Sequence, residues 1–208
     1  MKLQLALDEL SLKDAMELSE ELEDYIDIIE IGTPFVLREG IGVVEKFAKA
    51  FPQKEILADI KIMDAGEYES MIAYAAGAKY CTVLGVSDVS TIQDCHNTAK
   101  KYNGKSVVDL ICVKDLEAKI IEFENIGIDV LAIHTGTDQQ KLGRTPLDDL
   151  RDVKNFTKTS KIAVAGGISS KTIDRYVALK PDIIIVGSAI CGNEDPLWEA
   201  KLIKSKMV

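Results

Sequence analysis

Closely spaced cysteines are missing from this sequence. Its four cysteines, Cys81, Cys95, Cys112 and Cys191, lie far apart, and none forms a C-x-x-C pair. A structural metal site or a disulfide framework is therefore not expected, because both need clustered or paired cysteines. Cys81 and Cys112 lie in apolar runs, so we predict buried, reduced thiols in a cytoplasmic protein.

Long hydrophobic runs and excess positive charge are also missing. No run approaches the roughly 20 apolar residues that span a bilayer, and the start, MKLQLALDELSLKD, indicates no export signal. Lysine and arginine number 25 against 34 acidic residues, a formal net charge of −9. Neither nucleic acid nor a membrane is therefore expected as a partner. An anionic substrate would need local binding groups, such as backbone N–H groups at a helix start.

The chain does contain short apolar runs at regular intervals, each followed by an amphipathic stretch. Their continuous Val, Ile and Leu character predicts strands buried on both faces, as in a parallel sheet. The eight runs are LQLAL (3–7), IDIIEI (26–31), EILADIK (55–61), KYCTVLG (79–85), SVVDLI (106–111), DVLAIH (129–134), KIAVAGG (161–167) and DIIIVG (182–187).

The stretches between the runs have helical spacing. Segments 11–25, 66–78 and 88–104 carry apolar residues at this spacing; the first begins with a serine, and the other two end near a glycine. Eight strands alternating with helices in 208 residues predict an α/β fold, a (β/α)₈ TIM barrel. An open doubly wound sheet is the alternative, but no G-x-G-x-x-G follows the first run. No linker or Gly/Ser-rich hinge divides the chain, so we predict one domain over residues 1–208.

Titratable residues stand at the ends of these runs. In such a barrel the reacting groups gather at the carboxyl ends of the strands. Any single acid there could be a helix cap or a turn residue, but several together are costly to bury unless they are paired or bind a metal. The candidates are Asp8, Glu30, Asp59, Lys61, Asp109 and His134. The other histidine, His96, lies in the helix-like DCHNTAKK and is expected on the surface.

The last two runs end in glycine instead. Gly166 and Gly167 lead into SKTID, and Gly187 with Ser188 leads into CGNED. Glycine permits close approach of a ligand to the backbone, and a following helix start directs N–H groups at an anion. Phosphate sites of such barrels frequently lie after strands seven and eight, so a phosphorylated substrate is predicted. The alternative is that these glycines only make turns.

The segment LADIKIMDAGEYE carries Asp59, Lys61 and Asp64 as D-x-K-x-x-D. Together with LQLALD, IEIGTP, IHTGTDQQ, AVAGGI and IIVGSAI, it resembles the orotidine monophosphate decarboxylase suprafamily over the whole chain. Within the suprafamily, these segments most resemble those of the 3-hexulose-6-phosphate synthases. The resemblance implies a lyase that fixes formaldehyde by a Mg²⁺-dependent aldol condensation with D-ribulose 5-phosphate, giving D-arabino-hex-3-ulose 6-phosphate.

The resemblance also implies roles for the residues. Glu30 and Asp59 would hold Mg²⁺, directly or through water, and Lys61 would support an enediolate oxyanion. His134 would move a proton at the sugar, and Asp109 on strand five would be a further catalytic residue. Asp8 would bind sugar hydroxyls. Asp64 would reach the active site of a partner subunit, which implies a homodimer with shared sites, or it would simply cap the next helix.

Two other functions remain open at this stage. A 3-keto-L-gulonate-6-phosphate decarboxylase would form the same kind of enediolate by losing CO₂. That relative typically has arginines after the strand-six histidine and a glutamate on strand five. This chain has Thr135, Thr137 and Asp109 at those places, although Arg144 further along the loop could partly substitute. The third possibility is a barrel that binds a sugar phosphate without turning it over.

Overall fold

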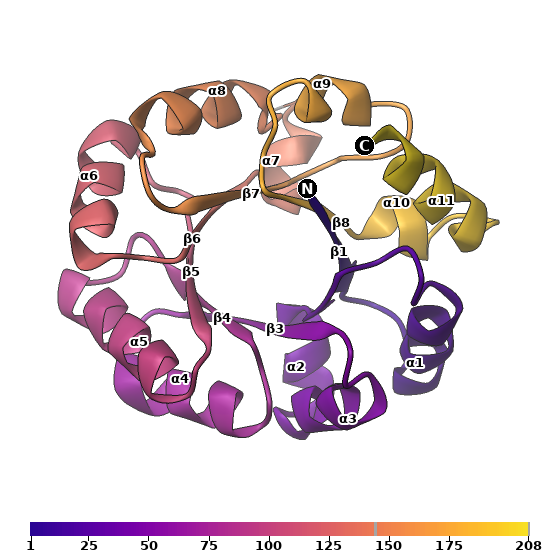
Figure 1. The fold of residues 1–208 in the computed structure, drawn as a ribbon, viewed down its shortest axis with the longest axis horizontal. Helices are drawn as coiled ribbons and strands as arrows, with labels where there is room; N and C mark the ends of the chain where they lie inside the picture. Colours follow the sequence, from indigo (N-terminus) through magenta and orange to yellow (C-terminus); the bar gives the residue numbers. More distant parts are fainter. Residues whose placement is uncertain (144, 208) are drawn as a thin grey trace.

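The computed structural model describes residues 1–143 and 145–207, and its eight strands close into a parallel barrel in chain order (Figure 1). This confirms the predicted (β/α)₈ architecture. The strands are β1 (Lys2–Leu7), β2 (Ile28–Ile31), β3 (Glu55–Ile62), β4 (Tyr80–Leu84), β5 (Lys105–Asp109), β6 (Val130–His134), β7 (Lys161–Ala165) and β8 (Ile183–Val186).

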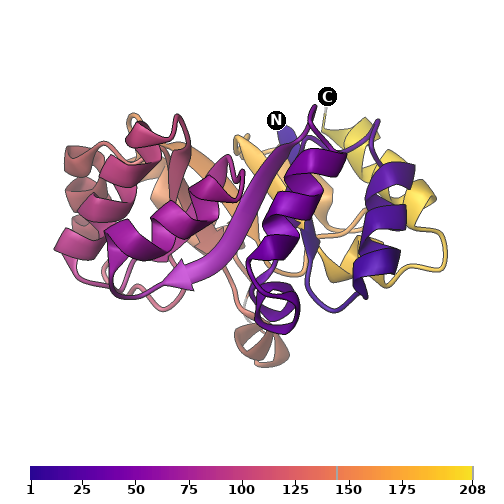
Figure 2. The same cartoon turned by 90° about the horizontal axis from the view of Figure 1, so that it is seen from below.

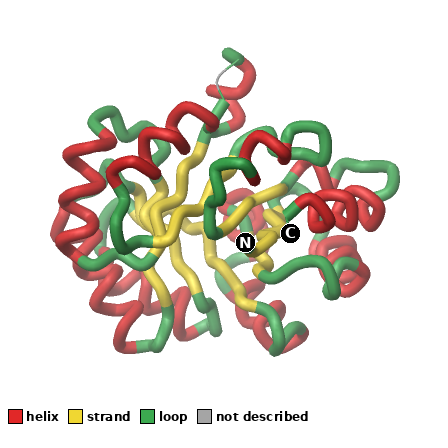
Figure 3. The backbone as a smooth tube through the Cα atoms, turned by 45° about the horizontal axis from the view of Figure 1, so that its top comes forward, coloured by secondary structure: helices red, strands yellow, loops and turns green. Residues whose placement is uncertain are grey.

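The helices form an outer ring around the strands (Figures 1 and 3). Ser11 caps the first of them by accepting a hydrogen bond from the Asp14 amide at 3.2 Å, as its place in the sequence predicts. The helices are α1 (Leu12–Glu21), α2 (Thr33–Glu39), α3 (Gly42–Ala50), α4 (Gly66–Ala75), α5 (Val89–Lys101), α6 (Leu116–Ile126), α7 (Thr137–Lys141), α8 (Leu147–Phe156), α9 (Ile173–Val177), α10 (Ser188–Cys191) and α11 (Pro196–Lys206).

The strands from β2 to β8 contribute to two apolar layers, because successive side chains point to opposite faces. Leu3, Leu5 and Leu7 are fully buried in the large layer beneath the helices. A smaller cluster that includes Ile28, Leu57, Tyr80, Val107, Val130 and Ala163 fills the interior of the barrel. The same alternation turns Glu30, Asp59 and Asp109 inward, two residues beyond members of the inner cluster.

All strands run in one direction, so their carboxyl ends gather at one end of the barrel. In Figure 2 the arrow of β3 points away from the end that carries both termini. The short helix α7 projects from the end to which this arrow points (Figures 2 and 3). None of the helices described has the length and apolarity that crossing a bilayer takes.

Two predictions about single residues are wrong. Cys81 is buried as predicted, but Cys112 is exposed. The strand ends at Asp109, and the chain then turns with Cys112 in the left-handed region at φ 63°. His96 is not on the surface: it is 1 % exposed, and its Nδ1 lies 2.8 Å from the Ser106 hydroxyl at the start of β5.

Candidate active site

The titratable residues predicted for the rim lie close enough together to influence one another's pKa. Burial, and then the charge of Asp59, raise the pKa of Asp8, for example. The Asp8 carboxylate lies against Gly32 and Gly187, since a Cβ atom at these glycines would come within 2.0 and 3.8 Å of its oxygens. The group comprises Asp8, Glu30, Asp59, Lys61, Asp109 and His134.

Lys61 and Asp59 form an ion pair inside the barrel mouth. The Lys61 ammonium donates to Asp59 Oδ2, and it also lies 3.0 Å from the hydroxyl of Thr33, the first residue of α2. That hydroxyl donates to the Asp59 carbonyl oxygen at 2.7 Å. Burial on its own would lower the pKa of Lys61, but the charge and hydrogen bond of Asp59 outweigh it, and the pKa is raised. Lys61 is therefore a fixed positive charge at neutral pH.

Glu30 lies beside this pair and is almost fully buried. Its Oε2 accepts a hydrogen bond from Gln4 Nε2 at 2.7 Å. Burial and the charge of Asp59 raise its pKa from 4.5 to about 8. Three carboxylates, those of Asp8, Glu30 and Asp59, thus lie near one lysine. A bound divalent cation would offset the excess negative charge.

The available oxygen ligands suit Mg²⁺ better than a softer metal. Within residues 1–143 and 145–207, no three His, Cys, Asp or Glu side chains converge as a metal site. Glu30 and Asp59, the two carboxylates predicted to hold the ion, would be its protein ligands, and water would supply the others. Mg²⁺ typically binds in this way, keeping several waters and few carboxylates. The residues present fit the predicted ion.

His134 and Asp109 form a second pair across the mouth. His134 Nδ1 lies 2.9 Å from Asp109 Oδ2, so this nitrogen carries the proton and Nε2 is available to a substrate. Burial alone would lower the pKa of His134, but the hydrogen bond and charge of Asp109 outweigh it and raise the pKa above 6.5. The geometry is that of a general base oriented by an acid.

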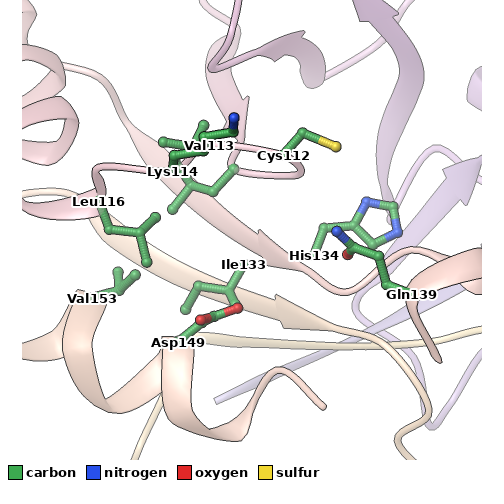
Figure 4. Close-up of a pocket in the computed structure, with 10 residues that line it drawn as sticks. Cys112, Val113, Lys114, Leu116, Ile133, His134, Gln139, Asp149 and Val153 are labelled. Carbon is green, nitrogen blue, oxygen red and sulfur yellow. The ribbon is translucent and has the colours of Figure 1, made fainter. Parts of the chain in front are cut away.

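A cavity of about 450 Å³ opens beside His134 (Figure 4). Its apolar wall includes Ile133, Leu116 and Val153, and its polar rim includes Lys114 and Gln139. A small molecule at His134 therefore has space next to it that the chain does not fill.

The two glycine loops, at Gly166 and Gly167 after β7 and at Gly187 after β8, also follow the carboxyl ends of strands. Gly166 and Gly167 have φ values of 123° and 66°, where side chains are strained. A Cβ atom at Gly166 would also lie 2.8 Å from the Thr135 carbonyl oxygen. The loop is fastened to α11, because the buried Glu199 accepts hydrogen bonds at 2.8 Å from both the amide and the hydroxyl of Ser170. Gly166 is partly exposed and Gly167 is exposed, and neither has a side chain of its own beside its backbone N–H group.

Asp64 is separate from the cluster. It is exposed on the loop between β3 and α4, and its Oδ1 accepts a hydrogen bond from the Ala65 amide at 2.8 Å. The helix begins at Gly66, with Ala65 in the N-cap place at φ 51° and no side-chain cap. Asp64 therefore does not occupy the cap position that the alternative interpretation required.

Neutral polar residues complete the site, and the sequence alone did not identify them. Gln4, Thr33 and Thr82 each bond a charged member, and Thr82 Oγ1 donates to Asp59 Oδ1 at 2.8 Å. Gln4 and Thr82 interrupt the apolar runs LQLAL and KYCTVLG at inward positions. A polar residue at an inward position of an apolar run is a feature by which the sequence could have identified them. Arg144, considered above as a substitute arginine, lies outside the described residues.

Comparison with known proteins shows which family the chain resembles. A family model described as Orotidine 5'-phosphate decarboxylase / HUMPS family matches residues 1–203. The chain is 45 % identical to 3-hexulose-6-phosphate synthase of Bacillus subtilis (strain 168), over all of this chain and 99 % of that protein.

Solved structures show the same relationship. The crystal structure of 3-hexulose-6-phosphate synthase from Salmonella typhimurium superposes with a TM-score of 0.98 at 52 % identity, covering 100 % of this chain and 98 % of the other. That of 3-keto-L-gulonate-6-phosphate decarboxylase from Vibrio cholerae gives 0.87 at 26 % identity, covering 99 % and 96 %. The chain belongs to the Orotidine 5'-phosphate decarboxylase / HUMPS family of enzymes.

Proposed function

We propose that this protein is a 3-hexulose-6-phosphate synthase. It joins D-ribulose 5-phosphate and formaldehyde by a Mg²⁺-dependent aldol condensation, giving D-arabino-hex-3-ulose 6-phosphate. The observation that carries the proposal is the pairing of Lys61 with Asp59 beside Glu30, with the His134–Asp109 pair also in the mouth. By their names, one kind of relative makes a sugar 6-phosphate and the other decarboxylates a sugar-acid 6-phosphate.

Each side chain of the site has a separate role in the proposed reaction. His134 Nε2 takes a proton from C1 of D-ribulose 5-phosphate, which leaves an enediolate across C1 and C2. C1 then attacks the carbon of formaldehyde, and the protonated His134 returns its proton to the new alkoxide. The Lys61 ammonium stabilises the negative charge that develops on the enediolate oxygen. Asp8 binds the sugar hydroxyls, while the loops at Gly166 and Gly187 bind the phosphate.

Glu30 and Asp59 would hold Mg²⁺, which when bound supplies positive charge close to the enediolate oxygens. Gln4 holds one oxygen of Glu30, and Thr82 holds one oxygen of Asp59. The other oxygen of Asp59 accepts from the Lys61 ammonium, so these contacts hold both carboxylates in a defined direction.

The decisive experiment is to mix the protein with ribulose 5-phosphate, formaldehyde and Mg²⁺ and to follow the loss of formaldehyde. Formation of the hexulose phosphate separates an enzyme from a barrel that only binds the sugar phosphate. A parallel assay of CO₂ release from 3-keto-L-gulonate 6-phosphate tests the decarboxylase. The higher identity to the named synthases, together with Thr135 and Thr137 after His134, favours formaldehyde as the substrate.

Asp109→Asn should move the pH profile of the reaction. His134 acts as a base only when neutral, so kcat/KM should fall as the pH drops through a pKa above 6.5. Without the charge of Asp109, burial and the nearby Lys61 lower that pKa, and the acid limb should shift to lower pH. The measurement is kcat/KM from pH 5 to 9 at saturating Mg²⁺. An acid limb that stays in place would contradict the role of the pair.

Gly166→Val should raise KM for the phosphorylated sugar by about 10- to 150-fold, since losing a charge-assisted hydrogen bond costs about 1.5–3 kcal/mol. The side chain enters where backbone N–H groups meet phosphate oxygens. Gly40→Val is the control: it has the same kind of strained backbone, with φ 74° and nothing within 4 Å of a new Cβ atom. Equal reaction of unphosphorylated ribulose with the unaltered protein would argue against a phosphate site.

A further inference from the structure

The ladder between β3 and β4 is irregular at the candidate site. Ala58 pairs with Cys81 and Ile62 pairs with Val83, so three residues of β3 lie opposite Thr82 alone. Two of these three are Asp59 and Lys61. Such a bulge leaves backbone groups without ladder partners and redirects side chains, and bulges are over-represented next to active sites.

The hydroxyl of Thr82 fills the gap in this ladder. It accepts a hydrogen bond from the Lys61 amide at 2.9 Å and donates one to Asp59 Oδ1 at 2.8 Å. Thr82 is 5 % exposed, so water does not readily replace either bond. Lys61 itself is held at φ 48°, a conformation that costs free energy unless its surroundings fix it.

These contacts use different oxygens of the Asp59 carboxylate. Thr82 takes Oδ1, while the Lys61 ammonium takes Oδ2. One hydroxyl therefore orients the acid and, through the amide, the backbone that carries the lysine. A valine has the same shape but can make neither bond.

We propose that Thr82 is a positioning residue of this active site, whose hydroxyl holds Asp59 and the backbone of Lys61 in the geometry that the reaction needs. The inference rests on the proposed function for its effect on catalysis. The two hydrogen bonds of the Thr82 hydroxyl, which we call the clamp, are a feature of the folded chain and can be measured without turnover.

The test compares Thr82→Val with Thr82→Ser. The valine variant should lose about 10- to 100-fold in kcat, as is typical for groups that orient metal ligands, with little change in KM for the sugar phosphate. The serine variant keeps the hydroxyl and should stay within about threefold of the wild-type kcat. Thr98→Val is the matched control, because Thr98 is also buried but its hydroxyl has no partner among the described residues. Its kcat should not change.

Amide hydrogen exchange measured by NMR gives the second readout. The Lys61 N–H should be protected in the wild type and in Thr82→Ser, and should exchange at least about tenfold faster in Thr82→Val. Wild-type kcat and Lys61 protection in Thr82→Val would overturn the inference, as would an equal loss of kcat in both variants.

Two further outcomes are also decisive. If Thr82→Val does not fold, a folded Thr82→Ser that keeps kcat and protection supports the role of the hydroxyl, and one that loses both overturns it. If the wild type shows no turnover, the proposed function fails, and protection of the Lys61 amide then decides the clamp on its own.

Discussion

Asp59→Asn should lower kcat by about a thousandfold or more, since it removes a charge that both pairs with Lys61 and is proposed to bind the metal. Asparagine keeps the volume and can still accept the hydrogen bond from Thr82. Its NH₂ group, however, faces the Lys61 ammonium, and because both groups are donors they form no hydrogen bond. Glu30→Gln should have a comparable effect, because it removes the other charged ligand. The measurement is formaldehyde loss with ribulose 5-phosphate and Mg²⁺.

Thermal unfolding separates loss of the metal site from loss of the fold. Mg²⁺ at 100 times its Kd should raise the Tm of the wild type by roughly 5–10 °C, and that of either variant by much less. Without Mg²⁺ the variants should unfold near the wild-type temperature. Asp152→Asn, at an exposed position on α8, is the control for the chemical change. Full activity in EDTA would count decisively against the metal.

The barrel was predictable because buried parallel strands read as continuous apolar runs. All eight runs are strands in the structure. The same rule failed at Cys112, because apolar residues continue past the end of β5 at Asp109 as Leu110, Ile111 and Cys112, while the chain already turns. It failed in the opposite sense at His96, whose burial depends on Ser106, a partner on β5 that helix periodicity does not reveal.

The charged part of the site was predictable for an energetic reason. Asp59, Lys61 and His134 stand at the ends of apolar runs, where burial of a charge needs a partner or a function. Thr82 interrupts an apolar run, but a neutral hydroxyl is a weaker signal than a charge, since burying it costs less. The bulge that makes it important depends on how β3 pairs with β4, and a single strand does not encode that pairing.

The largest effect outside the metal site is expected at Asp64. Exposed apolar side chains lie on the loops and helix starts near it, with Met63 54 %, Tyr68 64 % and Val86 44 % exposed. A symmetric dimer that buries this surface would bring Asp64 toward the neighbouring barrel mouth. We propose that Asp64 completes the partner's site near Lys61. Asp64→Asn and Lys61→Ala should then each be nearly inactive.

Mixing these two variants tests where Asp64 acts. With random exchange, half of the dimers are mixed, and one of the two sites in each mixed dimer has both residues intact, so about a quarter of wild-type sites should return. Lys61→Ala mixed with Asp59→Asn is the control: both changes affect the site of their own chain, and no site recovers. Subunit exchange is verified by mass spectrometry of differently labelled chains. If exchange is complete and Asp64→Asn still fails to complement Lys61→Ala, Asp64 serves its own chain.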